Sequence, residues 1–182
     1  MNMNLNPGRG KAIAIAAQAK QPAWQTIVIF TLAFWISSSL ILDLLIMPGL
    51  YASGMMAESG FATAGYLIFW MFNRVEVLAA AVVLTGVLAC RNTQRTPDNR
   101  SFTGIILSLL LLSIALVCTY VLTPEMSALG LQLNLFEPVV EVPNTMNQLH
   151  GSYWVLEAIK LVAGGVLLNS CYRSQVASNQ AA

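Results

Sequence analysis

Residues 102–123, FTGIILSLLLLSIALVCTYVLT, contain no charged side chain and are followed directly by Pro124. A helix of this length rises about 33 Å at about 1.5 Å per residue, which is enough to cross a hydrocarbon layer of about 30 Å. In lipid such a segment must be a helix, because a helix satisfies its own backbone N–H and C=O groups. The stretch therefore predicts a membrane-spanning helix and sets the class of the whole fold.

Three further stretches have the same character. We expect them at residues 24–47, 61–90 and 149–172, with tails at 1–23 and 173–182. Of the 182 residues, 57% are hydrophobic and 9% are charged, and the mean hydropathy is +0.67. A soluble domain carries about 25% charged residues. The composition thus excludes an ordinary soluble domain and predicts an all-α polytopic protein, a four-helix bundle in contact with the lipid bilayer.

The basic residues outside these spans gather on one side of the predicted bundle. They lie in the two tails and between the second and third spans, whereas the loops 48–60 and 124–148 contain no Lys or Arg. Because Lys and Arg concentrate in cytoplasmic segments, we expect both termini in the cytoplasm. The membrane would be a bacterial inner membrane or an internal membrane such as the thylakoid. The net charge of +1 offers no basic surface for nucleic acid.

Prolines are expected to end two of the spans, at Pro48 and at Pro124, because proline breaks the helical hydrogen-bond ladder. In the loop 124–148, leucines alternate with Gly, Gln and Asn between residues 129 and 135. A period of two is typical of extended chain, and two prolines further along exclude a helix there. We therefore expect this loop to lie extended on the outer face, as a connector or as a lid over a cavity.

Polar residues inside the spans are the candidates for function. An ionisable side chain at the centre of a span costs about 2.5–3.5 kcal/mol on insertion scales, and such residues often mark a path for protons or ions. In the fourth span, polar residues recur every three or four positions from His150 to Lys160, which places them on one helix face. The residues that would form an intramembrane polar path are Asp43, Asn73, Arg74, Glu76, Glu157 and Lys160.

The charges within the spans can cancel in pairs. Arg74 and Glu76 are about 160° apart around the helix, at about 100° per residue, so they cannot both face one partner. We expect Glu76 to pair with Lys160, and Arg74 to pair with Glu157 or Asp43. Such pairs either fix the order of the helices or mark a path for protons, ions or metal, and the sequence leaves both interpretations open.

Metal and enzyme chemistry have less support. His150 is the only histidine, and together with Met47 and Met146 it offers the imidazole and thioether ligands that suit Cu(I). Methionine is, however, an ordinary packing residue in apolar proteins. The chain contains no P-loop and no GxGxxG, HExxH or CxxC motif. We therefore predict a protein that is not an enzyme and that binds no cofactor, with copper handling as a weaker alternative.

Two segments resemble a known family. LILDLLIMPGLY at residues 40–51, followed by ATAGYLIF at 62–69, is similar to the bacterial four-span membrane family called domain of unknown function 4149, which is related to transmembrane protein 205 of animals. The start of the last span, LHGS at 149–152, resembles that family's Leu-His-x-x-Ser pattern, whereas Glu157 stands where the family has Asn or an apolar residue. The resemblance covers about 40–170 of the sequence and implies the four-span architecture. The family has no established activity.

The leading functional hypothesis is a non-enzymatic membrane protein that acts by binding partners. No catalytic set is visible, and little of the chain lies outside the predicted spans. Such a protein would be a small subunit or an assembly factor of a membrane complex, and its partners would be other membrane-protein subunits or a second copy of itself. The alternative is a small transporter or channel for protons, ions or metal.

Overall fold

A computed structural model describes residues 7–55, 60–93, 99–136 and 144–180. These residues form helices and turns, and no strand occurs among them, so the all-α class is confirmed. Two π-helical turns, η1 and η3, interrupt the α-helices. The elements in chain order are α1 (Pro7–Ile41), η1 (Leu42–Ile46), α2 (Met47–Ala52), α3 (Phe61–Thr93), α4 (Asn99–Val117), η3 (Cys118–Leu122), α5 (Thr123–Phe136) and α6 (Asn144–Gln180).

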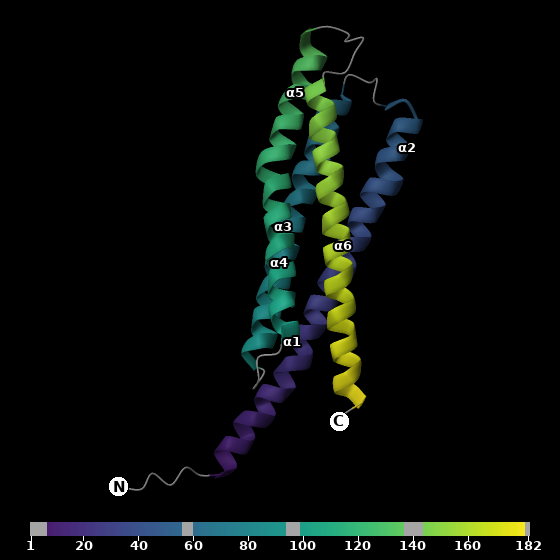
Figure 1. Cartoon of the computed structure of the whole chain (residues 1–182). Coiled ribbons are helices and arrows are strands. Elements are labelled where there is room, and N and C mark those ends of the chain that lie inside the picture. The colour runs from purple at the N-terminus through teal and green to yellow at the C-terminus, as the bar shows by residue number, and fades with distance from the viewer. Residues whose placement is uncertain (1–6, 56–59, 94–98, 137–143, 181–182) are drawn as a thin grey trace, which may run out of the picture.

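Four segments of these helices are long and apolar enough to cross a membrane. They coincide with the four expected stretches, and three of them extend further than predicted; the segments are Ala23–Ala52, Thr63–Asn92, Phe102–Gly130 and Asn144–Ala177. The start of α1 and the end of α6 lie at the same end of the bundle (Figure 1). The coarse prediction of an all-α architecture with four helices long and apolar enough to cross a membrane is therefore confirmed.

The helices α1, α3, α4 and α6 form a closed ring in which α1 packs on α3, α3 on α4, α4 on α6, and α6 on α1. Consequently α1 and α4 face each other across one diagonal of the bundle, and α3 and α6 across the other. Two clusters of apolar side chains fill the interior. The inner layer, on the side where α1 begins, includes Val28, Leu32, Ala80, Val83, Leu111 and Leu167; the outer layer includes Phe69, Ile114, Leu122 and Tyr153.

One glycine sets the distance between α1 and α3. A Cβ atom at Gly86 would lie 2.3 Å from Cγ2 of Val28, so a larger residue at that position requires the Val28 side chain or the helices to shift. Small residues permit this kind of close helix approach. The contact fixes which face of α3 points towards the interior, and that face carries the polar residues described below.

Two helical segments continue past the prolines that were expected to end them, so this part of the prediction is wrong. Each proline follows a π-helical turn: η1 ends two residues before Pro48, and η3 ends two residues before Pro124. At the end of η1, the N–H of Met47 bonds to the carbonyl of Leu42, five residues back, and η3 closes in the same way. Proline has no N–H and its ring crowds the carbonyl four residues earlier, so the wider turn gives that carbonyl room and the helix continues.

The leucine-rich stretch after Pro124 is helical, as α5, and not extended as expected. An alternating pattern also places leucines four positions apart, for example at positions 129 and 133. Positions four apart share one face of a helix, just as they share one side of a strand. The alternation therefore did not exclude a helix. The two later prolines of the predicted loop, Pro138 and Pro143, lie outside the described residues.

Candidate functional site

Four ionisable side chains meet in the interior between the two apolar layers. Asp43 comes from η1, Glu76 from α3, and Glu157 and Lys160 from successive turns of α6. Their exposed fractions are 5%, 1%, 2% and 3%. We refer to these four residues as the carboxylate–lysine cluster.

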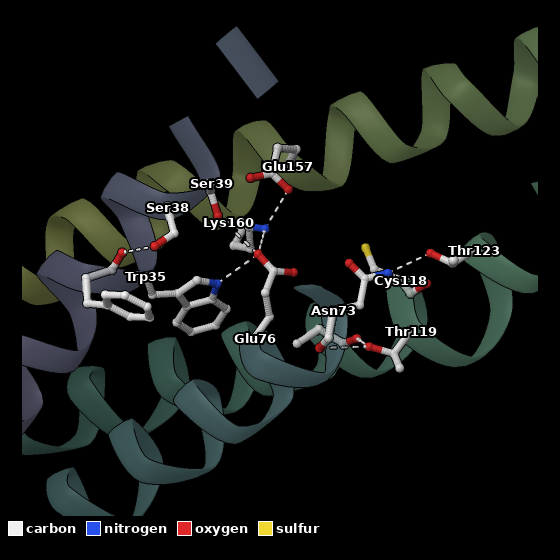
Figure 2. A network of polar contacts seen from close by, with 12 residues as sticks. Trp35, Ser38, Ser39, Asn73, Glu76, Cys118, Thr119, Thr123, Glu157 and Lys160 are labelled. Atoms are coloured by element: carbon white, nitrogen blue, oxygen red, sulfur yellow. Dashed lines mark hydrogen bonds and ion pairs between the residues drawn. The ribbon is translucent and has the colours of Figure 1, made fainter. Parts of the chain in front are cut away.

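Lys160 is the centre of the cluster (Figure 2). Its Nζ forms ion pairs with Oε1 of Glu76 and with Oε2 of Glu157, the latter at 2.6 Å. The predicted pair between Glu76 and Lys160 is thus confirmed. Because the backbones of α3 and α6 do not pack against each other, this ion pair joins the two helices across the middle of the bundle.

Glu76 is also bound from α1. Its Oε1 accepts a hydrogen bond from Nε1 of Trp35 at 2.9 Å and one from Oγ of Ser39 at 3.0 Å. Trp35 was not predicted from the sequence as a site residue. The signal that could have identified it is spacing: Trp35, Ser39 and Asp43 are four residues apart and share one helix face. Three donors from two helices therefore hold a single carboxylate oxygen in place.

The cluster contains more acid than base. Asp43, Glu76 and Glu157 supply three buried carboxyl groups, and Lys160 supplies one ammonium group. Oδ2 of Asp43 and Oε1 of Glu157 are buried and have no hydrogen-bond partner among the described residues. Three carboxylates against one ammonium group leave two uncompensated negative charges in a site that is almost closed to solvent. The cluster is therefore electroneutral only when it also binds two protons, or other cations.

Asn73 lies one turn from Glu76 on the same face of α3, and it is bound to the second π-helical turn. Its Nδ2 donates to Oγ1 of Thr123 at 2.6 Å and to the carbonyl of Cys118 at 3.4 Å. Oγ1 of Thr119 lies 2.6 Å from the carbonyl oxygen of Ala115 in its own helix and 3.3 Å from that of Asn73, and its single hydrogen can serve only one of the two. The structure thus places Asn73 in a polar contact that holds α3 against η3, close to the cluster but separate from its ion pairs.

Arg74 does not join the cluster, so its predicted pairing with Glu157 or Asp43 is wrong. The side chain is exposed on the outside of α3, and its Cζ atom lies 3.5 Å from the centroid of the Trp70 ring. The cause is the opposed orientation of Arg74 and Glu76 around the helix. Once Glu76 faces Lys160, Arg74 must face outwards. Lys160 then pairs with Glu157 as well as with Glu76.

The proposed copper ligands are placed less favourably. His150 is exposed, and its Nδ1 lies 2.9 Å from the carbonyl oxygen of Met146 in its own helix. Met146 is buried, and Met47 is half-buried on the separate helix α2. The described parts of the chain contain no group of three His, Cys, Asp or Glu side chains that could hold a metal ion. The predicted polar face of α6 is confirmed from Tyr153 onwards, where the residues are buried, but it does not include His150.

Apolar side chains close the cluster on both sides along the bundle. On the outer side, the ring of Tyr153 meets Phe69 edge to face, with centroids 5.7 Å apart and an interplanar angle of 82°. On the inner side lies the layer around Leu32 and Leu111. A small hollow of about 10 Å³ lies beside Ser39 and Lys160, which is room for about one water molecule. The cluster is therefore a buried polar layer between two apolar layers, with a hollow of about the size of one water molecule beside it.

The chain was compared with known protein families, with curated proteins and with solved structures, and none of them matches it. The chemistry of the site therefore rests on its own geometry.

Proposed function

We propose that the protein is a multi-pass integral membrane protein that binds and releases protons at the carboxylate–lysine cluster, as a small proton-coupled transporter or channel. The observation that carries this proposal is the surplus of buried carboxyl groups over ammonium groups. Because of this surplus, we favour a transporter or channel over a subunit of a membrane complex. From the sequence alone, the subunit was the leading hypothesis. Carboxyl groups inside membrane spans commonly serve as proton relays.

A purely structural role would require fewer acids. The pair between Glu76 and Lys160 is enough to join α3 to α6. Asp43 and Glu157 each add a buried oxygen without a hydrogen-bond partner, and a buried unsatisfied group costs about 1–3 kcal/mol. Glu157 also pairs with Lys160 within α6, but neither Glu157 nor Asp43 is needed to join α3 to α6. A site that exchanges protons needs them, because each is a place where a proton can reside.

The arrangement of the helices supports a route on the outer side. Asp43 lies in η1, directly before α2, and α2 has no buried residues and packs against no described element other than η1. In Figure 1, α2 diverges from the other helices. Within the cluster, ion pairs join Glu157 to Lys160 and Lys160 to Glu76. We propose that protons enter past Asp43 when the outer contact between Tyr153 and Phe69 opens, and that the inner apolar layer closes the opposite side.

We further propose the orientation that the charges favour, with both termini in the cytoplasm of a bacterial inner membrane or of an internal membrane such as the thylakoid. Arg91 and Arg173 are exposed, and both follow the apolar parts of their helices at the end of the bundle where α1 begins. The positive-inside rule supports this orientation. The resemblance to the family called domain of unknown function 4149 supports the same four-span arrangement and is part of the proposal.

A second candidate function, as a subunit that binds another membrane protein, is favoured by one observation. Arg74 is an exposed cation on the outside of α3, within a helix long and apolar enough to cross a membrane. A cation in this position lacks a counter-charge in lipid, so a partner that supplies one would be favoured.

Reconstitution tests the transport proposal. Purified protein in liposomes with an entrapped pH-sensitive dye and an imposed membrane potential should move protons faster than empty liposomes. Glu76→Gln should abolish this movement, because it removes the carboxyl group that is bound at the end of the route. Arg173→Gln, which removes an exposed charge elsewhere, should leave it unchanged. Wild-type liposomes that leak no faster than empty ones would sink the proposal.

A further inference from the structure

Arg74 has no counter-charge within its own bundle. It is exposed on the outside of α3, and it forms no ion pair with any carboxylate in the described parts of the chain. Around it, α3 exposes the apolar side chains of Leu67, Met71 and Leu78. Because hydrocarbon cannot stabilise the guanidinium charge, the charge must be balanced either by a second protein, as considered above, or by a lipid headgroup at the edge of the hydrocarbon.

The side chain of Arg74 extends along α3 towards the outer end of the bundle, where α3 begins. Its Cζ atom lies 3.5 Å from the centroid of the Trp70 ring, and Trp70 is one helical turn nearer that end. Side chains on a helix lean towards its N-terminus, and long basic side chains use this reach to carry their charge out of the hydrocarbon. The guanidinium group therefore lies at the level of Trp70.

This level is close to the boundary of the hydrocarbon. The apolar segment of α3, Thr63–Asn92, has 30 residues and is about 45 Å long, which exceeds a hydrocarbon layer of about 30 Å by about 15 Å. When the segment is centred, about 7 Å of it extends beyond the hydrocarbon at each end. Trp70 lies about 10 Å from Thr63 along the helix, so the guanidinium group is only about 3 Å inside the boundary. A phosphate group of the adjacent leaflet is within its reach.

Three hydrogen-bond donors follow one ridge of α3 through this level. Tyr66, Trp70 and Arg74 are spaced four residues apart, so they lie on successive turns of the helix surface. The phenol hydroxyl, the indole N–H and the guanidinium N–H groups can each donate to a phosphate oxygen. None of them donates to an acceptor in the part of the chain that the structure describes. Tyrosine and tryptophan are also the residues that gather at the level of lipid headgroups.

We propose that this ridge binds the phosphate group of one anionic phospholipid, in the leaflet at the end of the bundle where α3 begins. The guanidinium group of Arg74 pairs with the phosphate, which it can grip with two parallel N–H groups, and Trp70 and Tyr66 donate to the remaining oxygens. The acyl chains lie along the exposed apolar side chains of α3. The inference goes beyond the proposed function: it requires insertion of the four helices, but it does not depend on the proton chemistry of the cluster.

The charge of the ridge identifies an anionic lipid as the occupant. Of its three members only Arg74 is charged, and the nearest acid along α3, Glu76, is buried on the opposite side of the helix. A zwitterionic lipid would bring its own cation close to the guanidinium group, whereas phosphatidylglycerol carries the phosphate charge alone. A second copy of the chain placed with the same ridge on this face would bring a second Arg74 and would double the positive charge.

Quenching of Trp70 fluorescence by brominated lipids tests the site. The protein is reconstituted in phosphatidylcholine with increasing amounts of brominated phosphatidylglycerol, and brominated phosphatidylcholine in the same bilayer gives the reference. The signal of the matching protein with Trp70→Phe is subtracted, which isolates Trp70 from the other tryptophans. One basic residue near a membrane surface gives a preference for anionic lipid of about fivefold. We expect this preference at Trp70 in the wild type and its loss in Arg74→Gln.

A matched control separates this site from the general charge of the protein. Arg173→Gln removes an exposed arginine at the other end of the bundle, and it should keep the full preference at Trp70. Helix content measured by circular dichroism verifies that each variant is folded. A preference that Arg74→Gln leaves unchanged, or that Arg173→Gln lowers as much, would overturn the proposal. Equal quenching by the two brominated lipids in the wild type would also overturn it, and would leave a protein partner as the source of the counter-charge.

Discussion

Lys160→Met and Glu76→Gln should destabilise the protein unequally, although they remove the two partners of one ion pair. Lys160 is paired with both Glu76 and Glu157, so its loss leaves two buried acids without a counter-charge. Removal of one partner from a buried pair costs about 3–5 kcal/mol. Glu76→Gln leaves Lys160 paired with Glu157, and the amide oxygen still accepts from Trp35 and Ser39, so we expect a cost of about 1–3 kcal/mol.

The double variant measures how strongly the pair is coupled. In the double variant, the removal of the Lys160 ammonium group no longer leaves a charged carboxylate at position 76 without a partner. The loss in the free energy of unfolding should therefore be smaller than the sum of the two single losses. Interaction energies between contacting residues are about 0.5–3 kcal/mol. The assay is reversible unfolding in mixed micelles of mild detergent and dodecyl sulfate, followed by circular dichroism. Arg173→Met, which removes an exposed cation from the same helix, should change the free energy of unfolding by less than about 0.5 kcal/mol. Additive single effects, or a larger loss for Glu76→Gln than for Lys160→Met, would refute the reasoning.

Three further predictions follow from packing, hydrogen bonding and charge. Gly86→Ala should lower the free energy of unfolding by about 1–3 kcal/mol, because the new Cβ would meet Val28 at 2.3 Å. Gly165→Ala is the control, because a Cβ there has open space, and it should cost less than about 0.5 kcal/mol. Equal losses in the same assay would contradict the tight contact. Asn73→Leu should cost about 1–3 kcal/mol and speed amide exchange in η3, because it removes the donor to Thr123; unchanged exchange would contradict the link. A reporter that is active only in the cytoplasm should be active when fused to either terminus, and activity at one terminus alone would exclude an even number of membrane crossings.

The sequence was sufficient to predict the four spans and one ion pair, for physical reasons that can be stated. Apolar length alone decides that a segment such as residues 102–123 is a helix, because no other form satisfies its backbone in lipid. The pair between Glu76 and Lys160 follows from their helical faces, since Asn73 and Glu76 share a face of α3 and Glu157 and Lys160 share a face of α6. Residue spacing determines these faces without knowledge of the neighbouring helices.

The convergence of acids and the position of Arg74 required the rotation of each helix about its own axis. The spacing of Arg74 and Glu76 shows that they point in opposite directions, but it does not show which of the two faces the interior. The choice is made by residues further along α3: Gly86 must lie against Val28, and Ala80 and Val83 are buried in the inner apolar layer on the same side. Asp43 was predicted to belong to the polar path, but the continuation of the helix beyond it was not, because Pro48 reads as a helix end and the π-helical turn that precedes Pro48 leaves no distinct mark in the sequence.

The two π-helical turns occupy one diagonal of the bundle and the bound charges occupy the other. η1 continues α1 and η3 continues α4, whereas Glu76, Glu157 and Lys160 lie on α3 and α6. A helix changes direction most easily at a π-helical turn or near a proline. The diagonal of α3 and α6 is fixed by ion pairs, and α5 packs against α3 and α6, so the segment free to move is α2, beyond η1. Among the four residues of the cluster, Asp43 alone belongs to a turn of this kind.

Proton binding at Asp43 should therefore be coupled to the motion of α2. We expect hydrogen–deuterium exchange of the α2 amides, corrected for the chemical rate, to vary with pH in the wild type and to lose this dependence in Asp43→Asn. The amides of α1 around Leu32 serve as an internal control, because they lie beside the inner apolar layer and precede the turn. If α2 shows the same pH dependence with and without the Asp43 carboxyl group, the link between charge and hinge is wrong. Exchange that changes equally in α2 and around Leu32 would indicate a general loss of stability and would contradict a local hinge at η1.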